Sequence, residues 1–298
     1  MIEIRVDDPA DPRIDDYTGL RDPSRRVRVE AKGGFFVAEG VFVIERLLRS
    51  DLRIRSVLVT PDRLERLRRL LEPADVAVFV ADREVMSTVV GFDIHRGAVA
   101  AANRPPPVGL DRAVDSRLVL AVEGVNDHEN LGAIIRSAAG LGVDMMVLDP
   151  TCADPWYRRS VRVSMGGVFD LPIVRVDSLT DATSRFREWG FRIVAMAADS
   201  HAIRLDDVER GLPTVVALGA EGPGLSRSML ETADLVVTIP MHRGLDSLNV
   251  GHAAAIAMHH FGVFDQLPIE NVTVSSTTTP ATPGDAGMSN EAESPSPP

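Results

Sequence analysis

Short apolar runs alternate with amphipathic segments along most of the chain. Runs rich in Val, Ile and Ala predict buried strands at 54–60, 76–82, 97–103, 117–125, 143–150, 171–176, 192–198, 214–222 and 235–240. Apolar residues at helical spacing predict helices at 35–50, 62–71, 130–142 and 250–264. Strands that alternate with helices in this way are typical of an α/β fold with a mainly parallel sheet covered on both faces.

Two changes in composition divide the chain. Three prolines in NRPPPVGLDRAVD (103–115) follow a predicted strand, and the stretch after residue 271 is rich in Ser, Thr, Pro and Gly. We therefore expect an N-terminal arm and a small α/β domain over 1–104, a linker over 105–116, a second α/β domain over 117–266 and a disordered tail over 267–298.

Length and composition narrow the class of protein. The 298 residues are 45% hydrophobic, enough for one large or two ordinary globular domains. No apolar run approaches the roughly 20 residues of a membrane helix, and the polar start MIEIRVDDPADPR does not resemble a secretory signal. Cys152 is the single cysteine, and no Cys/His cluster has the spacing of zinc ligands. These features predict a cytoplasmic protein without a disulfide, a metal site or a membrane partner.

The net charge of −11 is unevenly distributed. Residues 1–104 carry 18 basic and 18 acidic side chains, whereas residues 265–298 carry five acidic and no basic ones. A nucleic-acid binder usually presents a basic surface, so any such surface here must be local. Two groups of arginines could form such a surface: Arg25, Arg26 and Arg28 in the N-terminal arm, and Arg158, Arg159 and Arg162 beside two aromatic residues. Each group either contacts RNA or consists of solvated surface charges.

Three loops of the second domain follow predicted strands and carry the candidate chemistry. In open parallel sheets, ligands bind beyond the carboxyl ends of the strands, where NDHENLGAIIR (126–136), GAEGPGLS (219–226) and PMHRGLDSLN (240–249) are expected. The glycines of the second loop allow a backbone to approach a ligand closely, with Glu221 pointing into the site. Structural explanations remain open: Asn130 and Asn249 can be helix caps, and Arg136 a surface charge. Neither a dinucleotide fingerprint nor a phosphate-binding loop is present.

In these loops the chain resembles the SpoU/TrmH family of RNA ribose 2′-O-methyltransferases, which belong to the SPOUT class. The family's three motifs read NLGAIIRSAAGLGVD, LGAEGPGLS and IPMHRGLDSLNVGHAAAIAMHH here, in the family's order, over about residues 117–264. A weaker similarity, in FVAEGVFVIERLL (36–48) and the stretch 91–100, relates the N-terminal part to the family's ribosomal-protein-like substrate-binding domain. One departure is Gly251-His252, where many family members have Ser-Val.

The resemblance implies a C-terminal SPOUT domain with a deep trefoil knot, a topology that sequence rules alone would reject. It also implies S-adenosylmethionine as the cofactor, RNA as the substrate and a homodimer in which the partner contributes to the active site. By motif, the cofactor-binding residues are Leu218, Gly219, Gly222, Ile239, Met241 and Leu248. The implied catalytic residues are Asn130, Arg136, Glu221, Ser247 and Asn249.

These residues suggest roles in methylating a ribose 2′-hydroxyl. The family's candidate for deprotonating the hydroxyl is Arg136, but an arginine stays protonated in proteins and is a poor base. We therefore expect Arg136 to hold the neighbouring phosphate and stabilise the developing alkoxide. Glu221 would orient Arg136 or Asn130, while Ser247 and Asn249 would hold the loop and the hydroxyl. The accessory domain favours ribosomal RNA; the alternatives are a tRNA methyltransferase, a base-methylating SPOUT enzyme and a non-catalytic RNA-binding or ribosome-assembly factor.

Overall fold

The computed structural model describes residues 1–22, 29–30 and 32–262. All of them belong to one unit, Met1–Phe264. The tail predicted over 267–298 and the arginines Arg25, Arg26 and Arg28 lie outside the described residues. Within the described part of the chain, no helix is long and apolar enough to cross a membrane, and no group of His, Cys, Asp and Glu is arranged to hold a metal ion.

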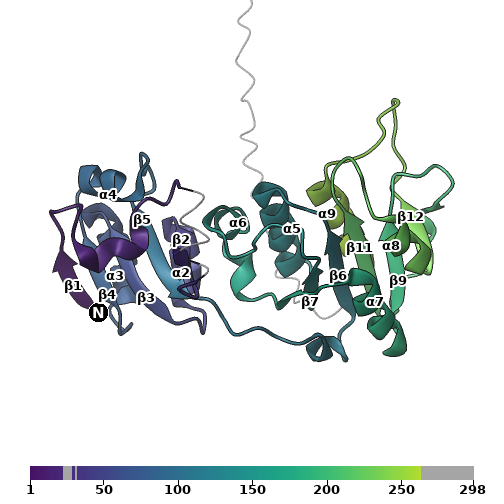
Figure 1. Cartoon of the computed structure of the whole chain (residues 1–298), viewed down its shortest axis with the longest axis horizontal. Coiled ribbons are helices and arrows are strands. Elements are labelled where there is room, and N and C mark those ends of the chain that lie inside the picture. The colour runs from purple at the N-terminus through teal and green to yellow at the C-terminus, as the bar shows by residue number, and fades with distance from the viewer. Residues whose placement is uncertain (23–28, 31, 263–298) are drawn as a thin grey trace, which may run out of the picture. The chain divides into compact units, whose positions relative to one another are not determined.

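The N-terminal part contains a five-stranded sheet with helices packed against it (Figure 1). The strand order is β1-β4-β3-β5-β2, in which β1, β4 and β3 are parallel and β5 is antiparallel to both of its neighbours. The strands are β1 (Ile2–Arg5), β2 (Phe35–Glu39), β3 (Ile54–Val59), β4 (Ala77–Val80) and β5 (Ala98–Asn103). The helices are α2 (Val41–Leu48), α3 (Pro61–Leu71) and α4 (Arg83–Val90), preceded by the 3-10 helix η1 (Pro12–Tyr17).

The helix predicted over 35–50 is wrong in its first five residues. Phe35–Glu39 forms strand β2, whose residues are all buried and pair with β5. Gly40 has a φ of +96°, a conformation that favours glycine, and it ends the strand before α2 begins. A strand buried on both faces is a continuous apolar run, so its pattern merges with that of the helix that follows. The sequence also missed β1, which pairs with β4 where only an arm was expected.

The second sheet has seven strands in the order β10-β12-β9-β11-β6-β7-β8, and every pairing is parallel. The strands are β6 (Leu118–Glu123), β7 (Met145–Leu148), β8 (Ile173–Arg175), β9 (Arg192–Met196), β10 (Ile203–Arg204), β11 (Thr214–Gly219) and β12 (Leu235–Thr238). The helices are α5 (His128–Gly140), α6 (Arg158–Val163), α7 (Leu179–Glu188), α8 (Arg227–Thr232) and α9 (Val250–Phe261), with the 3-10 turns η3 (Leu110–Ala113), η4 (Gly167–Phe169) and η5 (Leu205–Asp207). The parallel α/β sheet predicted for this part is confirmed.

Alternate residues of β6 show that helices cover both faces of this sheet. Leu118, Leu120 and Val122 pack in one buried cluster with residues of α5 and α9, whereas Val119 and Ala121 pack in another with residues of α7 and α8 (Figure 1). Each buried Leu or Val contributes about 1.5–3 kcal/mol relative to an exposed one. The two clusters fix the sheet as a rigid support for the loops at its carboxyl edge.

Helix α5 packs closely against a neighbour on each of two sides. A Cβ on Gly132 would lie 2.7 Å from Cβ of Val163 in α6, and a Cβ on Gly251 would lie 3.4 Å from Cβ of Ala133. The contact with Ala133 would be an ordinary one, so the approach of α9 to α5 does not by itself require glycine; a Cβ on Gly251 would lie closer, at 3.1 Å, to the capping Oδ1 of Asn249. His252 is exposed, and nothing in the structure explains it.

Candidate active site

The first of the three loops ends in a helix cap that the sequence did not identify. Asp127 caps α5, because its side chain accepts hydrogen bonds from the backbone N–H groups of Glu129 (2.9 Å) and Asn130 (2.8 Å). Helix α5 therefore begins at His128, two residues before the predicted start, and Asn130 lies in its first turn. This arrangement leaves the Asn130 side chain available to the neighbouring loops.

Asn249 joins all three loops. Its Oδ1 accepts a hydrogen bond from the backbone N–H of Gly251 (2.9 Å) and so caps α9. Its Nδ2 donates to Oε1 of Glu221 (2.5 Å) and to Oδ1 of Asn130 (2.8 Å). The backbone N–H of Val250 also donates to Glu221, at 3.3 Å. Three side chains that are up to 119 residues apart in sequence thus form one exposed polar cluster.

The glycine-rich loop after β11 folds back on itself. The N–H of Gly224 donates to the carbonyl of Ala220 (2.9 Å), and Gly222 and Gly224 both have positive φ. A Cβ on Gly219 would lie 2.1 Å from the carbonyl carbon of Gly224 and 2.2 Å from the nitrogen of Leu225, so only glycine fits there. The loop thereby exposes main-chain groups at the end of β11 and carries Glu221 beside Asn249.

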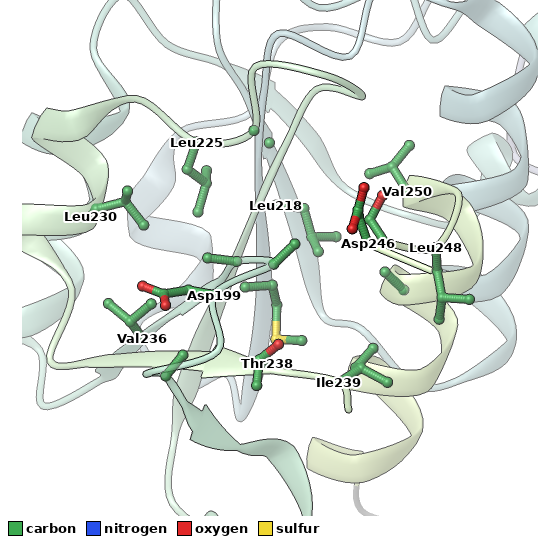
Figure 2. A pocket seen from close by; sticks show the side chains of 18 of the residues that line it. Asp199, Leu218, Leu225, Leu230, Val236, Thr238, Ile239, Asp246, Leu248 and Val250 are labelled. Atoms are coloured by element: carbon green, nitrogen blue, oxygen red, sulfur yellow. The ribbon is translucent and has the colours of Figure 1, made fainter. Parts of the chain in front are cut away.

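A cavity of about 1360 Å³ opens beside this loop, between β11, β12 and the segment that leads to α9. Figure 2 shows Leu218, Ile239 and Leu248 around it. All the predicted cofactor residues line this cavity: Leu218, Gly219, Gly222, Ile239, Met241 and Leu248. It combines apolar walls with backbone groups at strand ends and several polar side chains, which is typical of a small-molecule site.

Three carboxylates that line this cavity, Asp199, Asp234 and Asp246, were not predicted. Asp199 follows β9, and one of its oxygens accepts the N–H of His201 (2.8 Å). Asp246 lies in the segment before α9, near Leu248 (Figure 2). Asp199 and Asp234 lie outside the family's three motifs, whereas Asp246 lies within the third. The sequence signal for Asp199 and Asp246 was their position after a strand in the carboxyl-edge loops.

A second cavity, of about 570 Å³, adjoins the first along Ala220, Glu221 and Val250, which line both. Its remaining wall includes Glu123, Asp127 and Asn130. Glu123 is held in place by the backbone N–H of Ser226, which donates to its Oε2 at 2.7 Å. The lining contains acidic and amide groups but no Lys, Arg or His, so this cavity suits a polar neutral group better than a phosphate.

Two predicted catalytic residues stand apart from the cluster. Ser247 is exposed and lines the first cavity, but no hydrogen bond joins it to Asn249 or Glu221. Arg136 is exposed on α5 and lines neither cavity. Six residues along a helix place it about 120° around the axis from Asn130 and about 9 Å further on. A Cβ on Gly167 would lie 3.5 Å from its Cα, which places Arg136 on the η4 side of α5.

The arginines of the second candidate RNA patch have carboxylate partners. Arg158 hydrogen-bonds to Glu39, a carboxylate only 5% exposed, and Arg162 lies 3.7 Å from the same group. The guanidinium of Arg158 also lies over the ring of Phe92, at 4.6 Å. Arg159 is 51% exposed and lies 3.8 Å from Glu129. Of these three arginines, Arg159 is the most accessible to a nucleic acid.

Cys152 is not a nucleophile in this fold. It lies just beyond β7, where burial first and the neighbouring Asp149 second raise the pKa of its thiol to about 12. Partial burial opposes ionisation of Asp149, but hydrogen bonds from Thr151 and Cys152 lower the pKa of its carboxyl. A thiol with so high a pKa is almost entirely protonated at neutral pH, which makes Cys152 a poor nucleophile.

Two family models match the chain. The SpoU rRNA Methylase family matches residues 117–259, and the RNA 2′-O ribose methyltransferase substrate-binding family matches residues 37–108. The first match contains Asn130, Glu221 and Asn249, and the second begins in β2 and ends just beyond β5.

Individual proteins give the same result. A protein of Mycobacterium tuberculosis described as an uncharacterized tRNA/rRNA methyltransferase is 41% identical over 86% of this chain and 93% of its own. The 23S rRNA (guanosine-2′-O-)-methyltransferase RlmB of Acinetobacter baylyi is 30% identical over 74% of this chain and 94% of its own. The crystal structure of the SpoU methyltransferase AviRb from Streptomyces viridochromogenes in complex with AdoMet matches with a TM-score of 0.69 and 27% identity, covering 83% of this chain and 95% of that one. The chain belongs to the SpoU family of RNA methylases.

Proposed function

We propose that this protein transfers a methyl group from S-adenosylmethionine to a ribose 2′-hydroxyl of ribosomal RNA. The observation that carries the proposal is the Asn249–Glu221–Asn130 cluster at the junction of the two cavities. A methyl transfer needs a donor and an acceptor site that meet at a polar group able to orient a hydroxyl, and this junction provides both. An RNA substrate of this kind implies a cytoplasmic enzyme.

The first cavity fits S-adenosylmethionine, which supplies an electrophilic methyl group when bound. Leu218, Ile239 and Leu248 provide apolar surface for a flat base, and main-chain groups near Gly219 and Met241 can pair with its edge. Asp199 provides an acceptor for hydroxyl or ammonium groups in the same space. The closely folded glycine loop accounts for how a backbone can approach the cofactor here.

The acceptor ribose is expected in the second cavity, beside Glu221 and Asn130. Glu221 accepts hydrogen bonds from Asn249 and Val250, which fix its carboxylate at the junction. From there it can accept the hydrogen bond of a 2′-hydroxyl, hold its oxygen toward the donor site and take up the proton that the hydroxyl loses as the methyl group is transferred. Ser247, which lines the donor cavity, can orient the segment before α9.

Negative charge develops on the ribose oxygen as it reacts, and a nearby cation is needed to stabilise it. Arg136 is the family's residue for this role. Within one chain it lies on the α6 and η4 side of α5, whereas Asn130 faces α9. We therefore infer that the enzyme works as a homodimer in which Arg136 enters the partner's site. Its permanently charged guanidinium then binds the phosphate next to the reacting ribose and stabilises the alkoxide.

Mixing two inactive variants tests this arrangement. Arg136→Ala and Asn130→Ala proteins are co-denatured and refolded together so that mixed dimers form. If Arg136 acts across the interface, each mixed dimer contains one intact site, and methyl transfer recovers to about a quarter of the wild-type rate for random pairing. No recovery would show that Arg136 acts within its own chain.

We further propose that the chain forms the trefoil knot of the SPOUT class. Strand β12 pairs with β9, yet α9 packs on α5 near β6 and β11. Residues 239–249 must therefore cross the carboxyl ends of β9 and β11, beside the folded glycine loop. The positions of the strands also support the predicted domain limits. Strand β5 ends at Asn103 and β6 begins at Leu118, with only η3 between them.

The activity is tested with purified protein, methyl-labelled S-adenosylmethionine and RNA from cells that lack this protein. We expect label in ribosomal RNA, and 2′-O-methyl mapping should locate one or a few ribose positions. Label confined to transfer RNA would show that the substrate is transfer RNA instead of ribosomal RNA, and label on a base would indicate base methylation. S-adenosylmethionine binding without transfer to any RNA, or no binding at all, would contradict the proposal.

A further inference from the structure

Phe42 has no role in the proposed methyl transfer. Its position in FVAEGVFVIERLL predicts an apolar helix face, yet 61% of the side chain is exposed at the start of α2. The guanidinium carbon of Arg66, from the neighbouring helix α3, lies 4.6 Å from the centre of its ring. The exposed ring and the guanidinium stacked on it form a flat aromatic surface of the kind on which a nucleic-acid base can stack.

Further arginines continue this surface in both directions along the two helices. Toward the start of α2, Arg63 donates to the carbonyl of Arg96 (3.2 Å), whose side chain lies beside Gly40. Toward the other end, Arg49 follows Phe42 by about two helical turns, and Arg69 follows Arg66 by about one. We call this surface the α2–α3 ridge; it consists of Phe42, Arg49, Arg63, Arg66, Arg69 and Arg96.

The ridge carries excess positive charge although the chain as a whole is acidic. Arg63, Arg66 and Arg96 each lie 3.4–4.0 Å from a carboxylate, namely Asp62, Glu45 and Glu39. Arg49 and Arg69 are exposed, and neither side chain has a hydrogen bond or ion pair with another described residue. Among the described residues, therefore, two guanidinium groups without a carboxylate partner accompany an exposed aromatic ring.

We propose that the α2–α3 ridge binds a single-stranded segment of the RNA substrate, with a base stacked on Phe42 and the adjoining phosphates on Arg49 and Arg69. The inference rests on the proposed function and adds to it the surface that holds the RNA. Base stacking on an aromatic side chain and phosphate pairing with arginine are the two contacts that single strands use. All six ridge residues lie within 37–108, the part that matches the substrate-binding family.

Arg158 and Arg162 differ from Arg49 and Arg69 of the ridge because they already have a carboxylate partner. Those two guanidinium groups are directed at the buried carboxylate of Glu39 and are 14% and 30% exposed. Removing them from that carboxylate to reach a phosphate would leave a buried charge without a partner, which is strongly unfavourable. Arg49 and Arg69 meet a phosphate without that cost.

Fluorescence anisotropy with a short fluorescein-labelled single-stranded RNA of mixed sequence tests the ridge. We expect Phe42→Ala to weaken binding between about fivefold and a hundredfold, and Phe42→Tyr, which keeps a ring, to bind like the wild type. The double variant R49A/R69A should lower the slope of log Kd against log salt by about 1.4, the value for two lost phosphate contacts on a single strand. The control R112A/R227A removes two exposed arginines outside the N-terminal domain, one from the linker and one from α8, and should leave the slope unchanged.

Binding of the RNA by Phe42→Ala and R49A/R69A with wild-type affinity would overturn the inference, as would an equal loss in R112A/R227A. S-adenosylmethionine affinity, measured by calorimetry on each variant, should stay at the wild-type value and reports an intact methyltransferase domain. Failure of the proposed activity has a different signature, because a wild-type protein that methylates no RNA can still bind the labelled strand through the ridge. The two hypotheses can therefore fail separately.

Discussion

Replacing Asn249 separates its two structural tasks. Asn249→Ala removes both the cap of α9 and the hydrogen bonds to Glu221 and Asn130. Asn249→Asp keeps an oxygen that caps a helix as well as asparagine does, but it removes the N–H donors. It also places a carboxylate where Nδ2 now lies 2.5 Å from Oε1 of Glu221.

The expected losses of stability follow from these contacts. For Asn249→Ala, the lost cap costs about 1 kcal/mol and the two exposed hydrogen bonds add about 0.5–1 kcal/mol together. For Asn249→Asp the cap remains, and repulsion from the exposed Glu221 is screened by water and salt, so the loss stays below about 1 kcal/mol. Each kcal/mol corresponds to a melting temperature lower by about 2–4 °C in a chain of this size.

The two variants should behave alike in activity. Both lose the link that fixes Glu221 and Asn130, so we expect methyl transfer to ribosomal RNA to fall about a hundredfold in each, as when one oriented polar group is removed from a site. Thermal unfolding and incorporation of labelled methyl groups measure the two effects. Ser178→Ala is the control, because it removes the cap of α7 away from the site and should lower stability but keep activity. Wild-type transfer by Asn249→Asp would refute the role of the link.

Three further predictions concern single residues. Gly219→Ala should abolish S-adenosylmethionine binding in calorimetry, because its Cβ would lie 2.1 Å from backbone of Gly224, whereas Gly140→Ala, in open space on α5, should bind normally. Cys152 should resist iodoacetamide at neutral pH until the protein is unfolded, since burial raises its pKa to about 12; rapid labelling of the folded protein would contradict this. Burial lowers the pKa of His260 below its ordinary 6.5, so the unfolded chain takes up this proton first as the pH falls. His260 therefore does not lower the free energy of unfolding above about pH 6.5, but it lowers this free energy as the pH falls below that value. In urea titrations, the free energy of unfolding of His260→Gln should decrease less steeply with falling pH.

The candidate site was predictable because its residues share a topological position. Asn130, Glu221 and Asn249 each follow a parallel strand, and parallel strands bring their carboxyl ends to one edge of the sheet. Local sequence therefore sufficed to expect that the three side chains meet, although their roles in the reaction remain predictions. The cofactor residues were implied by the family motifs, and they line one cavity at the same edge.

Other features depend on contacts that no local pattern encodes. Arg158 follows two aromatic residues and was therefore a candidate RNA contact or a solvated charge, but its partner Glu39 lies 119 residues away. The sequence predicts β2 as part of a helix because burial on both faces erases the alternation that distinguishes a strand. Asp199 was missed since a single aspartate after a strand resembles any loop residue until the cavity is seen.

The side-chain chemistry at position 249 explains why an ordinary capping residue also serves the site. Ser, Thr and Asp all cap helices, but Asp repels Glu221, and a hydroxyl has one proton to offer two acceptors. Asparagine combines an acceptor for the N–H of Gly251 with two N–H donors, one for Glu221 and one for Asn130. The cap fixes the rotamer of Asn249, and the fixed rotamer directs both donors at the junction of the two cavities. Capping α9 and organising the site therefore depend on the same side chain, and a substitution can preserve both only if it keeps an acceptor and two donors on a side chain of the same length.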